Sequence, residues 1–190
     1  MIRFAVIGEI GSGKSYVAKQ FGHPVFNADL EVAKIYKKDK KCFLKIKKAL
    51  PSYISSFPIR KSELFRAIIS NKSNLKKIIK IIHPKIRKKM NSFIKKNKNK
   101  RIVVLDIPLL IENKINKKSD ILIFVDAPKK EINRRLKKRK DFNLKIVNIL
   151  KKFQLPVEVK KRKSNFIIKN NFDNSVKKNV KKVIGEIFKW

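Results

Sequence analysis

The chain has 190 residues, of which 51 are Lys or Arg and 14 are Asp or Glu, so its formal net charge is +37. A hydrophobic fraction of 43% supports the folded core of one α/β domain and argues against intrinsic disorder. The single cysteine, Cys42, excludes an internal disulfide and fits a reducing cytoplasm, and no stretch approaches the ~20 apolar residues that cross a bilayer.

The first half of the chain predicts two strand–helix pairs and then a helical segment. Short apolar runs bounded by turn residues predict buried strands at 3–7 and 25–26. Helical spacing follows each of them, over 15–21 and from about Leu30. Residues 40–99 are basic and mostly helical with no clear strand, so we interpret them as a helical insertion.

The second half returns to strands alternating with helices. The clearest strands are the apolar runs 101–106 and 121–126, and a last short strand is expected at 165–169. Residues 129–152 are densely basic and predict helices. A final helix, capped near residue 173 or 174, should run to about 188. Such alternation predicts a parallel sheet with helices on both faces.

The positive charge has two interpretations. One is a nucleic-acid-binding surface, because clustered lysines attract phosphates. The other is compositional bias, since the abundant Lys, Ile, Asn and Phe all have A/T-rich codons. The lysines are spread along the whole chain rather than gathered in one stripe, which favours bias. No specific nucleic-acid partner is therefore expected.

Residues 8–15 read GEIGSGKS and fit the phosphate-loop pattern G-x-x-x-x-G-K-[ST] at every fixed position. The glycines let main-chain N–H groups approach phosphate oxygens, the lysine reaches the β- and γ-phosphates, and the serine hydroxyl binds Mg²⁺. The expected nucleotide-binding residues are Gly8, Gly11, Ser12, Gly13, Lys14 and Ser15, with Ser15 also the metal ligand. The pattern predicts binding of a nucleoside triphosphate, ATP with Mg²⁺ in a kinase, but does not specify the reaction.

Acidic residues at strand ends are candidates for the acceptor side. Asp29 follows the second predicted strand and Asp106 ends the third, where the carboxyl ends of parallel strands gather ligand groups. A carboxylate there can take the proton of an acceptor hydroxyl. For Asp29, helix capping and catalysis are equally good interpretations, whereas for Asp126 capping is preferred.

Several motifs together resemble the dephospho-coenzyme A kinase family over nearly the whole chain. The motifs are VIGEIGSGKS at 6–15, Asn27-Ala28-Asp29, Ile82-His83-Pro84, DIPLL at 106–110, Arg135 with Arg139, Gln154-Leu155-Pro156, and FIIKN at 166–170. The phosphate loop alone is generic, but its combination with D-x-P-L-L, His-Pro and the x-A-D turn is much more specific.

The resemblance implies transfer of the ATP γ-phosphate to the ribose 3′-hydroxyl of dephospho-coenzyme A. It implies a three-layer α/β/α P-loop fold with a five-stranded parallel sheet, in which 1–39 and 100–190 form the nucleotide-binding core. Residues 40–99 would bind the substrate and about 129–155 would form a helical lid.

The resemblance also assigns residues. Catalysis would involve Asp29, Lys14, Arg135 and Arg139, and the acceptor wall would include Asn27, His83, Asp106, Pro108 and Leu109. Tyr16 and Asn170 would join the nucleotide-binding set, Asn170 near the adenine. The alternative for the two arginines, one helical turn apart, is a solvated basic face, although the choice of Arg in a lysine-rich chain favours a role. A cytoplasmic monomer or weak oligomer, without a membrane partner, is expected.

The sequence departs from the family pattern at several motif positions. Asn27 replaces the usual aspartate of the D-A-D turn, Glu9 a common glycine, and Tyr16 a common threonine. Leu150 stands where an arginine is frequent. Because an amide is no base, the proton-accepting role falls on Asp29.

Two alternatives remain open from the sequence. One is another small P-loop kinase, acting on a nucleoside monophosphate or a metabolite such as shikimate. The other is a basic RNA-binding protein with a degenerate phosphate loop, although the chain contains no RNP-like strand, zinc pattern or arginine–glycine tract.

Overall fold

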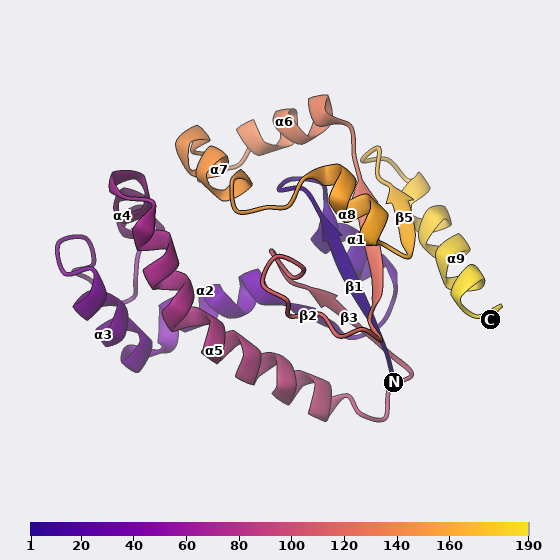
Figure 1. Ribbon diagram of the computed structural model, residues 1–190, viewed down its shortest axis with the longest axis horizontal. Helices are drawn as coiled ribbons and strands as arrows, with labels where there is room; N and C mark the ends of the chain where they lie inside the picture. The colour runs from indigo at the N-terminus through magenta and orange to yellow at the C-terminus, as the bar shows by residue number, and fades with distance from the viewer. Residues whose placement is uncertain (190) are drawn as a thin grey trace. The chain divides into compact units, whose positions relative to one another are not determined.

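The computed structural model describes residues 1–189 and contains two compact units. The core unit combines Met1–Asn27 with the chain from Asn97 onward, and the helical unit is Ala28–Lys96. Figure 1 labels the elements of both units along the chain.

The core unit contains a five-stranded parallel sheet in the order β2-β3-β1-β4-β5. Its strands are β1 (Ile2–Gly8), β2 (Val25–Asn27), β3 (Ile102–Asp106), β4 (Ile121–Asp126) and β5 (Phe166–Lys169). Its helices are α1 (Lys14–Gln20), α6 (Lys129–Lys137), α7 (Leu144–Lys151), α8 (Val157–Lys163) and α9 (Ser175–Ile187). The predicted α/β class and the five strands are confirmed.

Alternate strand residues place one apolar face of the sheet against α1 and α9. These strand residues are Phe4, Val6, Ile102, Val104, Ile123, Val125 and Ile168. They pack with Val17 of α1, with Phe21, which directly follows α1, and with a stripe on α9 at positions 176, 180, 183 and 187. The intervening residues are buried as well, and α8 packs against β1 and β4. Burial of both faces explains why these strands are continuous apolar runs.

The helical unit is built around one long helix. Its elements are α2 (Ala28–Lys38), α3 (Lys40–Ala49), α4 (Lys61–Ser70) and α5 (Ser73–Lys96), and α5 contacts each of the other three. The buried stripe of α5 contains Leu75, Ile78, Ile82, Ile86 and Met90, at helical spacing. Pro84 lies within this helix, on its exposed side.

Some boundaries differ from those expected. The helix expected near Leu30 begins at Ala28 and packs on α3 and α5, so the helical unit begins at residue 28 and not at 40. The basic segment 129–152 forms two helices, α6 and α7. Helix α8 was not predicted, because VEVKKRK offers too few apolar residues to show a period. No helix among residues 1–189 has the length and apolar character to span a membrane.

Candidate active site

The phosphate loop connects the end of β1 to the start of α1. All three glycines of the loop have positive φ, and Gly13 (φ 88°) immediately precedes the first residue of α1. A Cβ on Gly13 would lie 2.3 Å from the Asn170 side-chain nitrogen, so only glycine fits at this position. The loop is therefore shaped by close packing as well as by its own turn chemistry.

Lys14 folds back across the loop. Its Nζ donates to the carbonyl oxygen of Glu9 at 2.7 Å and more weakly to that of Gly8 at 3.4 Å. The loop closes further through the Ser12 N–H, which donates to the Glu9 carbonyl at 3.2 Å. These contacts hold the ammonium over the loop, where phosphate oxygens can replace the carbonyls.

Asn170 holds the other side of the loop from the end of β5. Its side chain is fully buried, its Nδ2 donates to the Ser12 carbonyl at 2.8 Å, and its Oδ1 accepts from the Phe172 N–H at 2.9 Å. The Asn170 N–H also donates to the Asp126 carbonyl at 2.7 Å. Asn170 therefore lies at the nucleotide loop, and in this structure its amide contacts the loop itself.

Three predicted residues meet at the ends of β2 and β3. Strand pairing places Asn27 beside Asp106, and the Asn27 Nδ2 donates to Asp106 Oδ2 at 2.5 Å and to Ser15 Oγ at 3.3 Å. Asp106 is 3% exposed, and burial raises its pKa, while Ser15, Lys14 and Asn27 act to lower it. A carboxylate next to the phosphate-loop hydroxyl is the arrangement with which P-loop enzymes bind Mg²⁺.

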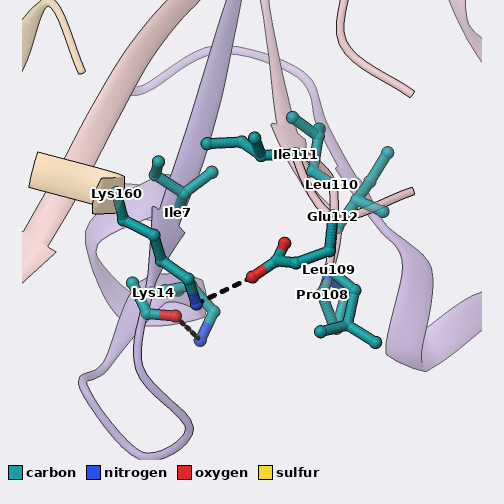
Figure 2. Close-up of a pocket in the computed structure, with 10 residues that line it drawn as sticks. Ile7, Lys14, Pro108, Leu109, Leu110, Ile111, Glu112 and Lys160 are labelled. Atoms are coloured by element: carbon teal, nitrogen blue, oxygen red, sulfur yellow. Dashed lines mark hydrogen bonds and ion pairs between the residues drawn. The ribbon is translucent and has the colours of Figure 1, made fainter. Parts of the chain in front are cut away.

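A small pocket lies beside this cluster. Figure 2 shows its lining residues, which come from the end of β1, from Lys14, from the segment after β3 and from α8. Pro108 and Leu109, which are predicted acceptor residues, line this pocket, and Leu109 has a left-handed backbone (φ 56°). Glu112 and Lys160 also line the pocket, and their side chains form an ion pair at 3.0 Å.

The two predicted arginines lie after β4, and both are exposed. Arg135 is on α6, and its guanidinium lies 4.5 Å from the centre of the Phe172 ring. The Phe172 ring in turn lies next to Gly13 of the phosphate loop. Helix α6 ends at Lys137, and Arg139 lies beyond it. The two arginines are therefore not one turn apart on a single helix, which is what their spacing in the sequence indicated. Tyr16, on α1, is 43% exposed.

Asp29 and His83 belong to the helical unit. Asp29 is exposed and lies within the first turn of α2, so it is not the residue that precedes the helix. It follows Asn27 by two residues along the chain. His83 is half-buried on α5, where burial and then the neighbouring Arg87 lower its pKa and favour the neutral imidazole.

Sequence reasoning missed Glu112 and Lys160. Glu112 follows the DIPLL motif by two residues, and this proximity was the available signal. Lys160 could not be distinguished from the many surface lysines by sequence, yet it is 3% exposed.

The fold and site together define a P-loop nucleotide-binding protein of the small-kinase type. The parallel sheet, the loop 8–15, and Asp106 beside Ser15 are its determining features. The sequence model of one family, described as dephospho-CoA kinase, matches residues 2–176. The chain belongs to the dephospho-CoA kinase family.

Individual relatives agree with this assignment. The chain is 32% identical over 179 residues to the dephospho-CoA kinase of Wolbachia pipientis wMel, covering 92% of this chain and 89% of that one. It is 34% identical over 171 residues to that of Bartonella quintana (strain Toulouse), covering 87% of each chain. Among solved structures, dephospho-CoA kinase from Campylobacter jejuni superimposes with a TM-score of 0.62 at 25% identity, covering 97% of this chain and 96% of that one. TT1252 from Thermus thermophilus gives a TM-score of 0.77, also at 25% identity, covering 98% and 96%.

Proposed function

We propose that this protein phosphorylates the ribose 3′-hydroxyl of dephospho-coenzyme A with ATP, giving coenzyme A and ADP. The observation that carries the proposal is a site with Lys14, Ser15 and Asp106 together in a chain that matches this family over residues 2–176. In the reaction the O3′–Pγ bond forms, the bond from Pγ to the β,γ-bridging oxygen breaks, and ADP leaves with that electron pair.

The nucleotide would be bound by the phosphate loop. Main-chain N–H groups from Gly8 to Ser15 face the phosphates, and Lys14 exchanges its carbonyl partners for β- and γ-phosphate oxygens. Tyr16 and Asn170 complete the predicted nucleotide-binding set. The contact from Asn170 to the Ser12 carbonyl supports a role in holding the loop, and its contact with adenine stays a prediction.

Ser15 and Asp106 fit a Mg²⁺ site. Both offer oxygen ligands, which Mg²⁺ prefers, and they already share a hydrogen-bond network with Asn27. The ion would neutralise charge on the phosphates of the nucleotide. The resemblance assigned Asp106 to the acceptor wall, and its position beside Ser15, with a hydrogen bond from Asn27, supports a role in binding the metal as well.

The acceptor hydroxyl would be activated by Asp29. This carboxylate is exposed at the start of α2, two residues after Asn27, and it would accept the 3′-hydroxyl proton as the new bond forms. Asn27, His83, Pro108 and Leu109 are the residues that would contact the acceptor, and residues 40–99 are the segment that would bind the substrate.

Arg135 and Arg139 would spread charge from the transferring phosphoryl group, as part of a lid over about 129–155. Both guanidiniums are exposed and therefore accessible to a ligand. We further propose that the protein acts in the cytoplasm as a monomer or weak oligomer, without a specific nucleic-acid partner.

The direct test is coenzyme A formation from ATP and dephospho-coenzyme A, with Mg²⁺ present and then chelated. We expect turnover that stops on chelation and is abolished in Lys14→Ala with the fold intact by circular dichroism. ATP consumption should also be measured with shikimate and with nucleoside monophosphates as acceptors. A preference for one of these over dephospho-coenzyme A would contradict the proposal. Steeply salt-dependent RNA binding without kinase activity would favour the RNA-binding alternative.

A further inference from the structure

Lys160 is unusual in this chain because its charge is buried. Although 51 residues are Lys or Arg, only Lys160 and Arg3 are buried cations within the described part of the chain. Arg3 donates two hydrogen bonds to Asp120, at 2.5 and 2.6 Å, and these hold the two side chains in an ion pair. Lys160 instead contacts one oxygen, Glu112 Oε1, at 3.0 Å.

The ion pair of Lys160 lies in the pocket beside the phosphate loop. Both of its residues line the pocket together with Gly8 and Lys14 (Figure 2). Two ammonium groups and one carboxylate give this pocket a net positive charge. Burying an ammonium is costly unless it is paired, and Lys160 is paired with Glu112 in an ion pair at 3.0 Å. An oxygen of an anionic group that enters this pocket, whose cavity volume is about 10 Å³, would meet two ammonium groups.

Glu112 is itself held in place. Its Oε1 also accepts the Leu155 N–H at 3.0 Å, so one carboxylate oxygen connects the segment after β3 to the segment that leads into α8. This fixed carboxylate positions the Lys160 ammonium at the pocket wall. Pro108 and Leu109, which the proposed function gives to the acceptor, line the same pocket.

We propose that Lys160, positioned by Glu112, binds the phosphoryl group on its acceptor side, that is, the 3′-phosphate as it forms on the product. The inference rests on the proposed function. Lys14 contacts the phosphoryl group from the nucleotide side, and Lys160 donates hydrogen bonds to its oxygens once the O3′–P bond forms. Lys160 transfers no proton and forms no covalent bond in this step. Its ligand class is a phosphate monoester, which distinguishes coenzyme A from dephospho-coenzyme A.

The test replaces the ion pair by a neutral pair. Lys160→Met and Glu112→Gln each leave an uncompensated buried group and should lower the melting temperature. The double variant Lys160→Met/Glu112→Gln removes both charges and should recover most of that loss. Lys163→Met, at an exposed position of the same helix, is the matched control and should behave as the wild type.

Binding and turnover of the double variant then separate a ligand contact from a structural role. We expect coenzyme A to bind at least ~10-fold more weakly by calorimetry and kcat to fall ~100-fold, while dephospho-coenzyme A affinity changes less than twofold. Recovery of coenzyme A affinity and kcat along with the melting temperature would overturn the inference. If the wild type formed no coenzyme A, the proposed function itself would fail. An active wild type with unaltered coenzyme A binding in the double variant would sink this inference alone.

Discussion

Glu63 provides the sharpest stability prediction, because its carboxylate is buried and both of its oxygens accept hydrogen bonds. It is 3% exposed, and its two oxygens accept hydrogen bonds from five donors. Oε1 accepts the Ser55 N–H, the Ser55 hydroxyl and the Ser56 N–H, and Oε2 accepts the Ser56 hydroxyl and the Arg60 N–H. The carboxylate thereby connects the loop before α4 to the helix it begins.

The magnitude follows from the pKa of this carboxyl. Burial alone would raise the pKa, but the hydrogen bonds from Ser55, Arg60 and Ser56 outweigh it and lower the pKa from its ordinary 4.5 to about 2. At about 1.36 kcal/mol per pKa unit this corresponds to ~3 kcal/mol of stability. Since the folded pKa is depressed, the contribution is fully present above pH 4.5 and is lost as the pH falls through about 2.

Glu63→Gln should therefore lower the free energy of unfolding by ~3 kcal/mol at pH 7, measured by urea unfolding. The glutamine carries no charge, and its NH₂ group would face the N–H and O–H donors that the carboxylate now accepts. The difference from wild type should shrink progressively below pH 4.5. Hydrogen exchange of the Ser55 and Arg60 amides should accelerate in the variant. Glu186→Gln, at a half-exposed site on α9, is the control and should change stability by less than about 0.5 kcal/mol. A Glu63→Gln cost below about 1 kcal/mol, or one independent of pH, would refute the reasoning.

Three further predictions concern the site. Asp29→Asn should lower kcat more than it raises the KM for dephospho-coenzyme A, and steady-state kinetics with an unchanged kcat would remove Asp29 from the catalytic residues. Asp106→Asn should raise the Mg²⁺ concentration for half-maximal activity at least ~10-fold, because a neutral amide is a weaker ligand; an unchanged Mg²⁺ titration would argue against metal binding by this residue. Asn170→Ala should raise the KM for ATP about tenfold, because it removes the hydrogen bond to the Ser12 carbonyl that holds the loop. An unchanged KM in an ATP titration would show that this hydrogen bond does not shape the loop.

The sequence alone determined those features that short segments encode. The loop 8–15 was recognisable because its glycines, lysine and serine have separate jobs at fixed spacing. All five strands could be predicted: β1, β3 and β4 are continuous apolar runs because both of their faces are buried, and β2 and β5 are short apolar runs bounded by polar turn residues. Boundaries were less accurate: α2 begins two residues earlier than expected, and α8 carries too few apolar residues to show a helical period.

Only the tertiary structure decided which distant groups meet. Parallel pairing of β2 with β3 puts the Asn27 amide on Asp106, 79 residues away, and the Ser12 carbonyl is bonded by Asn170, 158 residues away. Lys160 is indistinguishable by sequence among so many lysines, and its burial beside Glu112 depends on α8 packing over β1 and β4. Hydrogen bonds and ion pairs act over a few ångströms, so their partners are set by strand order and helix packing, which the local pattern of residues does not contain.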